Sequence, residues 1–313
     1  MWHITILGYD FFYLFYMFFI YAFIGWIYES TYVSIKKRMW VNRGFFNGPV
    51  IPIYGFGALI FYMVLWPYRD NKALTFFGGA VLATVLEYIT SWLMEAVFHT
   101  KWWDYSNYRF NIHGRVCLQA SILWGFLSVV MLNVIHPKID HLINKIPRKK
   151  GEYIGFLISS VFLADFVVTI IGTVKFTRLL NRIHILRQEL VEYISTSKLY
   201  EYKKETLEKL PMFRLFNIMK EYAASKDEII KESKIYQSLV IKKNYIRILK
   251  AFPTMVAGKR TMALQDLREK VFRKANINVN DVKEKVKGKV KISALWRKGH
   301  LKSYFRKRGK GRK

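Results

Sequence analysis

The chain has one cysteine, Cys117, so no disulfide can form within it. Cys117 has no Cys or His neighbour at metal-ligand spacing, which predicts a packing role. The phosphate-binding pattern G-x-x-x-x-G-K-[ST] is also missing, because Gly258-Lys259-Arg260-Thr261 lacks both the loop glycine and the correct next residue. Neither G-x-S-x-G nor H-E-x-x-H occurs. These absences argue against ATP hydrolysis by this chain itself, give no sign of a hydrolase or metalloprotease, and lead us to expect no cofactor and no metal.

Acidic residues are scarce, since 22 Asp and Glu stand against 51 Lys and Arg, a net charge of +29. The imbalance is uneven along the chain. Up to Val174 there are 14 basic and 9 acidic residues, a net +5, whereas from Lys175 onward there are 37 and 13, a net +24. Hydrophobic residues nevertheless make up 52% of the chain and aromatics 17%, more than a water-soluble domain usually carries. An apolar, aromatic first half is therefore followed by a basic second half.

Five apolar stretches reach, or nearly reach, the 20 or so residues that a helix needs to cross a bilayer. Backbone groups in lipid must pair within their own segment, which predicts helices rather than open strands. No basic segment precedes the first stretch and no cleavage site follows it, so we interpret it as a retained span and not a signal peptide. The predicted fold is all-α, a polytopic transmembrane bundle of about five spans. They are Tyr9–Tyr28, the short Ile51–Trp66, Leu74–Phe98, Val116–Ile135, which His136-Pro137 is expected to terminate, and Tyr153–Val174.

The distribution of Lys and Arg between the loops predicts the orientation, because cytoplasmic loops are enriched in both. With five spans, an outside N-terminus and a cytoplasmic C-terminus suit the first 28 residues, the loop after the first span and the +24 segment. The loop 136–152, with five cations, then lies on the wrong side, which leaves a re-entrant segment or a missed span open. We expect a multi-pass protein of the plasma membrane with a cytoplasmic C-terminus.

After Val174 the pattern becomes charged and helical. Leu179, Ile183, Leu186, Leu190 and Ile194 recur at three- and four-residue steps, which predicts an amphipathic helix continuing out of the fifth span. A second helix is expected over residues 213–249, between Pro211 and Pro253. The last 56 residues hold 20 Lys and Arg against 4 acids, which is typical of a loosely ordered tail. The predicted domains are 1–175, transmembrane; 176–257, a cytoplasmic helical extension; and 258–313, a basic flexible tail.

Polar residues on the third stretch indicate a site inside the bundle. Glu87, Ser91 and Glu95 are spaced by four and share one helix face. A carboxylate in lipid is costly and usually faces the bundle interior with a partner, so we predict that Glu87 lies within reach of Arg43 or Arg115. The competing interpretation is a structural ion pair, with Glu95 simply meeting water near the helix end. Asp165, on the fifth stretch, raises the same question.

Two unusual loops could supply the partners. Residues 42–57 contain glycines and prolines that rule out a regular helix, yet they are apolar, which predicts irregular backbone packed against protein at membrane depth. Residues 102–117 place aromatics, an acid and Arg115 before the fourth stretch; an aromatic belt and a snorkelling Arg115 are the competing interpretation. Together the loops and the span acids could form a neutralised buried network. The candidate polar site consists of Glu29, Arg43, Asn47, Glu87, Ser91, Glu95, Asp104, Asn111 and Arg115.

Several of these segments, in this order, resemble the CmpB-like family of bacterial ABC-transporter permeases, over roughly residues 10–175. The resemblance implies a polytopic bacterial membrane protein described as a permease subunit, and it brings no substrate and no catalytic residues with it. The segments are Gly25-Trp26-Ile27-Tyr28-Glu29, Arg43-Gly44-Phe45-Phe46-Asn47-Gly48-Pro49, Ile53-Tyr54-Gly55-Phe56-Gly57, Leu86-Glu87-Tyr88-Ile89-Thr90-Ser91-Trp92-Leu93-Met94-Glu95, Trp102-Trp103-Asp104-Tyr105-Ser106 and Gly114-Arg115-Val116-Cys117.

Three functions follow from these features. The first is a permease-like subunit without its own ATPase, working with a separate ATP-binding subunit and forming a homo-oligomer if five spans are too few for a pathway. The second is a membrane-embedded enzyme that uses buried carboxylates on a lipid-like substrate. The third is a membrane scaffold whose basic tail recruits partners. For that tail we favour anionic lipids over nucleic acid, because few aromatics interleave its cations.

Overall fold

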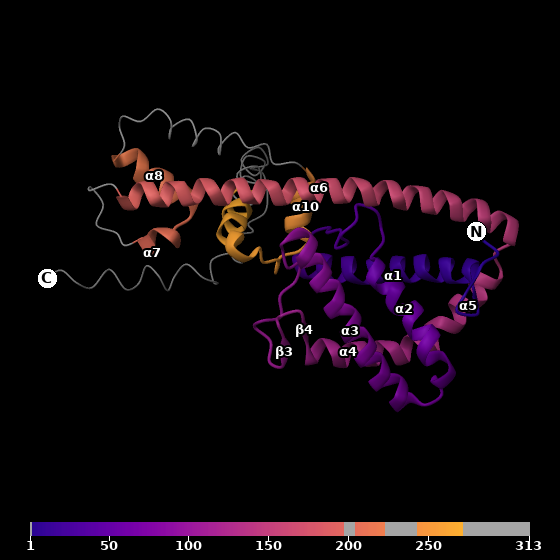
Figure 1. Ribbon diagram of the computed structural model, residues 1–313. Coiled ribbons are helices and arrows are strands. Elements are labelled where there is room, and N and C mark those ends of the chain that lie inside the picture. Colours follow the sequence, from indigo (N-terminus) through magenta and orange to yellow (C-terminus); the bar gives the residue numbers. More distant parts are fainter. Residues whose placement is uncertain (1, 197–203, 223–242, 272–313) are drawn as a thin grey trace, which may run out of the picture. The chain divides into compact units, whose positions relative to one another are not determined.

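The computed structural model describes residues 2–196, 204–222 and 243–271, and almost all of them belong to one compact unit, Met1–Arg268 (Figure 1). Three described residues, 269–271, belong to a second unit, Glu269–Lys313. The described part of the chain is helical, with two short hairpins as its strands. This confirms the all-α fold.

The first long helix, α1 (Phe11–Lys37), follows a hairpin formed by β1 (Thr5–Ile6) and β2 (Tyr9–Asp10). Asp10 caps it, because its carboxylate accepts a hydrogen bond from the Phe12 amide at 3.2 Å. Arg38 ends it in the left-handed conformation, with φ of 51°. A non-helical segment, residues 38–51, then leads to α2 (Pro52–Leu65), which begins at a proline as helices often do.

Two antiparallel helices complete the middle of the bundle. Helix α3 (Lys72–Phe98) follows the short η1 (Trp66–Tyr68) and is capped by Asn71, which accepts from the Leu74 amide. A loop with the hairpin β3 (Asn111–Ile112) and β4 (Val116–Cys117) leads to α4 (Leu118–Val130). Helix α3 packs most extensively on α4, and α1 on α2.

The prediction that His136-Pro137 ends the fourth span is wrong. Helix α4 passes through a π-helical turn, η2 (Met131–Ile135), directly into α5 (His136–Asn144). Proline removes one backbone donor and crowds the preceding turn, and π-helical turns are one way in which membrane helices accommodate it. His136 is completely buried rather than placed at a helix end.

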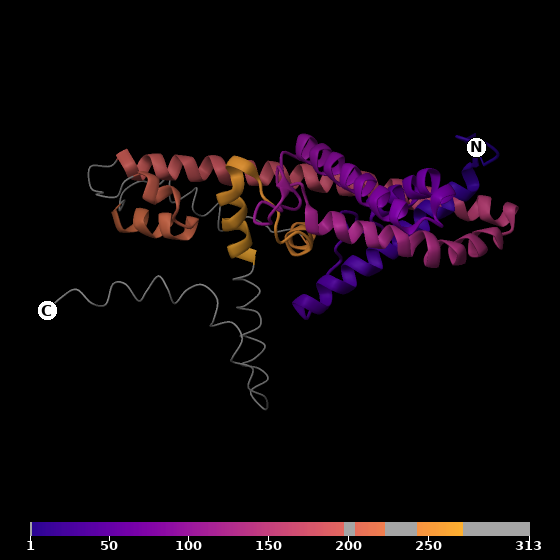
Figure 2. The ribbon, with the colours of Figure 1, turned by 90° about the horizontal axis from the view of Figure 1, so that it is seen from below.

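The last long helix, α6 (Arg148–Thr196), has 49 residues, about 74 Å at 1.5 Å per residue, far more than the bilayer core needs. It continues beyond the bundle, as the sequence predicts (Figures 1 and 2). The buried stripe is shifted from the predicted one: Ile183, Leu190 and Ile194 are buried, but Leu179 and Leu186 are only half-buried. The other buried positions on this face are Phe176, Leu180, Arg187 and Val191.

A small core surrounds the far part of α6. It contains α7 (Lys204–Glu208), α8 (Met212–Tyr222) and residues 261–268 of a further helix. The buried Arg187 donates to Asp266 at 2.8 Å and to the Glu208 and Leu210 carbonyls. The boundary expected at residue 258 is therefore wrong, because residues 258–268 are part of this unit. The rest of the expected flexible tail, 272–313, lies outside the described residues, as does 223–242 of the expected second helix.

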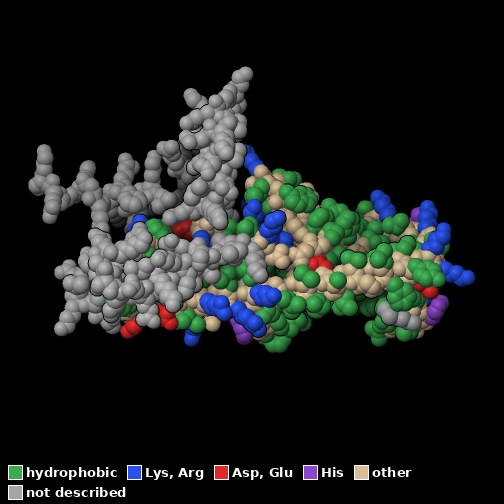
Figure 3. All heavy atoms as spheres, turned by 90° about the horizontal axis from the view of Figure 1, so that it is seen from above, with side chains coloured by type: hydrophobic (Ala, Val, Ile, Leu, Met, Phe, Trp, Pro, Cys, Tyr) green, Lys and Arg blue, Asp and Glu red, His purple; other side chains and the backbone are tan. Residues whose placement is uncertain are grey.

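Four helical segments are long and apolar enough to cross a membrane, and one shorter apolar helix, Pro52–Tyr68, accompanies them. The four are Phe11–Lys37, Lys72–Phe98, Leu118–Asn144 and Arg148–Ser195. Hydrophobic side chains cover much of the face seen in Figure 3, and Lys and Arg gather toward its ends. Exposed apolar residues such as Phe77, Val81 and Leu157 fit a lipid-facing surface. The chain is a membrane protein.

The bundle has two ends. At the first, the amino-terminal end, Arg148 joins the start of α6 to the start of α1 through Asp10, with contacts of 2.6 and 3.1 Å. At the second, the loop end, Lys37 donates to the Lys250 carbonyl at 2.6 Å. The cation-rich segment 136–152 thus lies at the same end as the N-terminus, where Asp10 and Glu152 offset part of its charge.

Candidate functional site

The segment 38–51 turns back into the bundle beside α1, and we call it the re-entrant loop. Its last residue bonds to Ala22, which lies four turns before the end of α1. Pro49, Gly44 and Gly48 keep it non-helical, as predicted, but the prediction is wrong for residues 52–57, which form the first turns of α2. Its route is marked by hydrogen bonds from Val41 N to Ser34 Oγ (2.9 Å), Arg43 N to Ser30 Oγ (3.2 Å), Trp26 Nε1 to Asn42 Oδ1 (2.9 Å) and Ile51 N to Ala22 O (3.0 Å).

Asp165 on α6 holds the amide groups of this loop. Its carboxylate accepts from the Asn47 amide at 3.2 Å, from Asn47 Nδ2 at 2.8 Å and from the Gly48 amide at 2.7 Å. The Thr169 hydroxyl donates to the same carboxylate at 3.2 Å. Irregular backbone at membrane depth needs such partners, because water is not there to supply them. Asn47, a predicted site residue, and Asp165 therefore form one structural contact.

Arg247 on α10 (Lys243–Ala251) holds the carbonyl groups of the same loop. Its guanidinium donates to the Gly44, Phe45 and Phe46 carbonyl oxygens at 2.9 to 3.0 Å. Burial lowers the pKa of Arg247, and the Asp165 carboxylate opposes that effect. The sequence analysis missed Arg247, since one arginine in a strongly basic segment gives no sign of its partner.

Two of the predicted acids pair with the two predicted bases. Glu29 contacts Arg43 at 3.4 Å and accepts from the Tyr54 hydroxyl at 3.0 Å. The Arg43 guanidinium also lies over the Phe252 ring, 4.5 Å from its centroid.

Glu95 contacts Arg115 at 2.8 Å, and Arg115 also donates to the Tyr88 hydroxyl at 3.1 Å. The hydrogen bond to the Glu95 carboxylate raises the pKa of Arg115. The interpretation of Glu95 as one half of a structural ion pair matches this geometry, and Arg115 does not reach Glu87.

Glu87 is buried, with 7% of its surface exposed, and neutral donors hold it. The Tyr105 hydroxyl donates to Oε1 at 3.2 Å and the Trp124 indole to Oε2 at 3.2 Å. Burial and the Glu87 charge raise the pKa of Tyr105, so its hydroxyl is a neutral donor. The prediction that Glu87 lies inside the bundle is correct, but the predicted contact with Arg43 or Arg115 is wrong, because both arginines pair with other acids.

The remaining predicted residues take no part in these pairs. The Asp104 carboxylate accepts from the Ser106 amide and hydroxyl, and Asn111 bonds to loop residues, so both build the loop before α4. Ser91 is buried, and its hydroxyl has no hydrogen-bond partner among the described residues. Cys117 is buried and free, as a packing role predicts. The candidate residues thus form separate contacts rather than one network.

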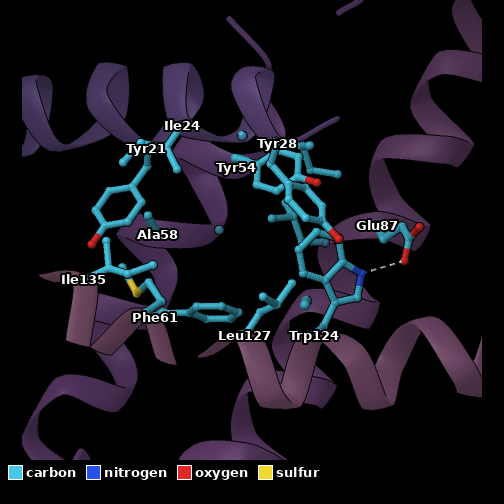
Figure 4. A pocket seen from close by; sticks show the side chains of 16 residues that line it. Tyr21, Ile24, Tyr28, Tyr54, Ala58, Phe61, Glu87, Trp124, Leu127 and Ile135 are labelled. Carbon is cyan, nitrogen blue, oxygen red and sulfur yellow. Dashed lines mark hydrogen bonds between the residues drawn. The ribbon is translucent and has the colours of Figure 1, made fainter. Parts of the chain in front are cut away.

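An apolar cavity of about 190 Å³ lies between α1, α2, α3 and the α4–η2 helix, next to Glu87 (Figure 4). Most of its wall is aliphatic or aromatic. Of the described residues that line it, Glu87 alone has a charged side chain. Figure 4 shows Tyr21 and Ile135 at one side, and Trp124 between the hollow and the Glu87 carboxylate. The lining consists of Tyr21, Ile24, Gly25, Tyr28, Ile53, Tyr54, Gly57, Ala58, Phe61, Ala83, Leu86, Glu87, Trp124, Leu127, Met131 and Ile135.

A chain of polar side chains leads from this cavity toward the amino-terminal end. The Tyr21 hydroxyl lies 3.3 Å from Nδ1 of His136, and the Tyr13 hydroxyl lies 3.4 Å from Nε2. Tyr13 donates to Asp140 at 2.7 Å, which leaves its oxygen to accept from Nε2–H. Nδ1 then accepts from Tyr21. This chain is not predicted from the sequence, because His136-Pro137 is typical of a helix end.

Among the described residues, no group of three His, Cys, Asp or Glu side chains could hold a metal ion.

Residues 16–170 match the family described as "Putative ABC-transporter type IV". The match confirms the predicted resemblance, and it includes the re-entrant loop, the cavity and Asp165. No curated protein matches the chain, and no solved structure does.

Proposed function

Residues 16–170 belong to the family described as "Putative ABC-transporter type IV", and from that membership we propose that the chain is a permease-like membrane subunit of an ABC-type transporter. It provides the membrane part, and a separate subunit provides ATP hydrolysis. The observation that carries this proposal is the cavity beside Glu87, which is lined by residues from four helical elements of the bundle. A cavity with one buried acid is what a solute pathway through an apolar bundle requires.

The sequence supports the need for a separate ATPase. The one segment that resembles part of a phosphate-binding loop, residues 258–261, has no loop glycine at the required spacing. In the structure it is a single 3₁₀ turn, η3 (Gly258–Arg260), leading into a helix. Such a turn offers no cradle of amide groups for a nucleotide phosphate.

Contacts at the loop end give the partner subunit a way to act on the bundle. Arg247 donates hydrogen bonds to the re-entrant loop. Lys101, which follows α3, and Val256, which follows α10, exchange backbone hydrogen bonds at 2.8 and 2.9 Å. A partner bound to the part of the chain after α6 would therefore pull on the loop that leads into α2. Coupling of this kind needs two arrangements of a packed element, and the re-entrant loop is the candidate element.

We place the protein in the plasma membrane with its C-terminus in the cytoplasm, as the positive charge after Val174 favours. Residues 272–313 lie outside the described residues, and anionic lipid remains the proposed partner of that basic segment. A second copy of the chain is the proposed way to complete a pathway.

Co-purification tests the proposal. The affinity-tagged full chain is extracted in mild detergent from cells of its source, and the bound proteins are identified by mass spectrometry. We expect a stoichiometric ATP-binding protein whose ATPase activity is recovered with the tag. The variant Arg247→Gln is the test of coupling, because it should keep the partner and change the ATPase rate. A chain that purifies without any ATP-binding protein, even after cross-linking in cells, would favour the enzyme or scaffold interpretations.

A further inference from the structure

Of the three glutamates Glu29, Glu87 and Glu95, one has no cationic partner. Glu29 is paired with Arg43 and Glu95 with Arg115, at 3.4 and 2.8 Å. Glu87 is more buried than either, yet among the described residues no Lys, Arg or His lies within ion-pair distance of it. A buried carboxylate without a countercharge is costly, and such groups in membrane proteins mark sites for ions, protons or substrates.

Two aromatic side chains that line the cavity donate hydrogen bonds to the carboxylates of Glu87 and Glu29. Trp124 lines the cavity and turns its indole N–H to Glu87 at 3.2 Å (Figure 4). Tyr54 also lines the cavity, and its hydroxyl donates to Glu29 at 3.0 Å. The two rings meet edge to face, with centroids 5.5 Å apart. A hydrogen bond from a ring donor to a carboxylate pushes electron density into the ring. Rings of this kind attract cations on their faces.

The residues that line the cavity indicate which chemical class of cation it could bind. A metal ion would need several oxygen or nitrogen ligands, whereas the rest of this lining is almost entirely aliphatic and aromatic. An engineered apolar cavity of about 150 Å³ accepts benzene, so about 190 Å³ suits a body of one ring and a small head group. Apolar walls, aromatic faces and a carboxylate behind them fit an organic ammonium ion.

We propose that this cavity binds a small organic cation, with its ammonium group against Trp124 and Tyr54 and its apolar body along Ala58 and Phe61. The inference rests on the proposed function, because it names the substrate class of the same pathway. Glu87 acts through Trp124, as the negative charge behind the ring. Glu95 lies on the same helix, does not line the cavity and is already paired.

The experiment uses the purified full chain in nanodiscs of zwitterionic lipid. Binding of benzyltrimethylammonium is measured by calorimetry and compared with that of neopentylbenzene, which has the same shape and no charge. We expect saturable binding of the cation, at least tenfold tighter than that of the neutral compound. Glu87→Gln should weaken it at least fivefold, Glu95→Gln should change it less than twofold, and Ala58→Leu, which fills the cavity, should abolish it.

Three results would overturn the proposal. They are equal binding of the charged and neutral compounds, unchanged binding in Glu87→Gln, and equal losses in Glu87→Gln and Glu95→Gln. The comparison of the two compounds uses the unmodified chain, so it decides the question even if Glu87→Gln fails to fold. No ATP-binding subunit takes part, so failure here would leave a positive co-purification result standing, and the converse also holds.

Discussion

Asp165 accepts four hydrogen bonds, and the three from Asn47 and Gly48 stabilise the re-entrant loop. In Asp165→Asn one acceptor oxygen becomes an NH₂ donor, and a backbone N–H in the bundle loses its acceptor. An unsatisfied buried group costs about 1–3 kcal/mol. We therefore expect the variant to unfold at a lower temperature in detergent, as measured by the melting of the purified full chain.

The matched control for this prediction is Asp70→Asn, which removes the same charge from an exposed turn. Surface changes of this kind usually alter stability by about 0.5 kcal/mol or less. If Asp165→Asn melts at the same temperature as Asp70→Asn, the Asp165 carboxylate does not stabilise the amide groups of the re-entrant loop.

At this scale, spacing predicts which helix face a residue shares but not which loop residue covers it. Glu87, Ser91 and Glu95 share a face, as predicted, and Glu87 and Ser91 are buried. The partner of each acid depends on how the loop 99–117 folds over that face. Arg115 reaches Glu95, while Tyr105 from the same loop reaches Glu87. Tyr105 belongs to the loop for which an aromatic belt is the competing interpretation, and Trp124 has no distinguishing sequence pattern, so neither is predicted as a donor to Glu87.

Between elements, the contact of α2 with α1 depends on a glycine. A Cβ at Gly55 would lie 2.6 to 2.8 Å from the ring and carbonyl oxygen of Phe18, closer than real atoms approach. A backbone oxygen cannot move aside as a flexible side chain can. Overpacking of this kind costs about 1–3 kcal/mol. We expect Gly55→Ala to lower the melting temperature and to separate α2 from α1.

Gly57 on the same helix provides the control, because a Cβ there would meet Leu86 at 3.7 Å, an ordinary contact. Gly57→Ala should be tolerated, since alanine also favours the helix more than glycine does. Cross-linking between α1 and α2, together with thermal melting, distinguishes the variants. Equal stability of Gly55→Ala and Gly57→Ala would mean that the two helices are not held this closely.

The sequence predicts the beginnings and ends of the helices only in part. Prolines and glycines correctly excluded a helix over residues 42–51, but Pro52 begins a helix instead of extending the loop. Pro137 does not end its helix as predicted, because the turn before it is π-helical and the helix continues into α5. Proline fixes its own φ, removes one hydrogen bond and crowds the preceding turn, so its effect depends on the geometry of that turn.

Over the whole bundle, the cation count of loop 136–152 conflicted with the predicted orientation, and the structure gives a physical reason. The re-entrant loop and the 14-residue α2 together lead from the loop end to the amino-terminal end, although α2 is too short to do so as a full span. The chain therefore runs between the two ends five times, and 136–152 returns to the N-terminus. At that end, Arg148 forms salt bridges with Asp10 and Glu152, so part of the positive charge of 136–152 is offset in the folded chain.

This route predicts which loops share a side of the membrane, and sided labelling tests it. In a Cys117→Ala background, Lys149→Cys marks the amino-terminal end and Arg109→Cys the loop end; both positions are exposed. Residues 243–260 also bind at the loop end. We expect a membrane-impermeant maleimide to label Lys149→Cys in intact cells and Arg109→Cys only after permeabilisation. The reverse pattern would place the +24 segment outside, and labelling of both in intact cells would mean that α2 and its loop do not cross.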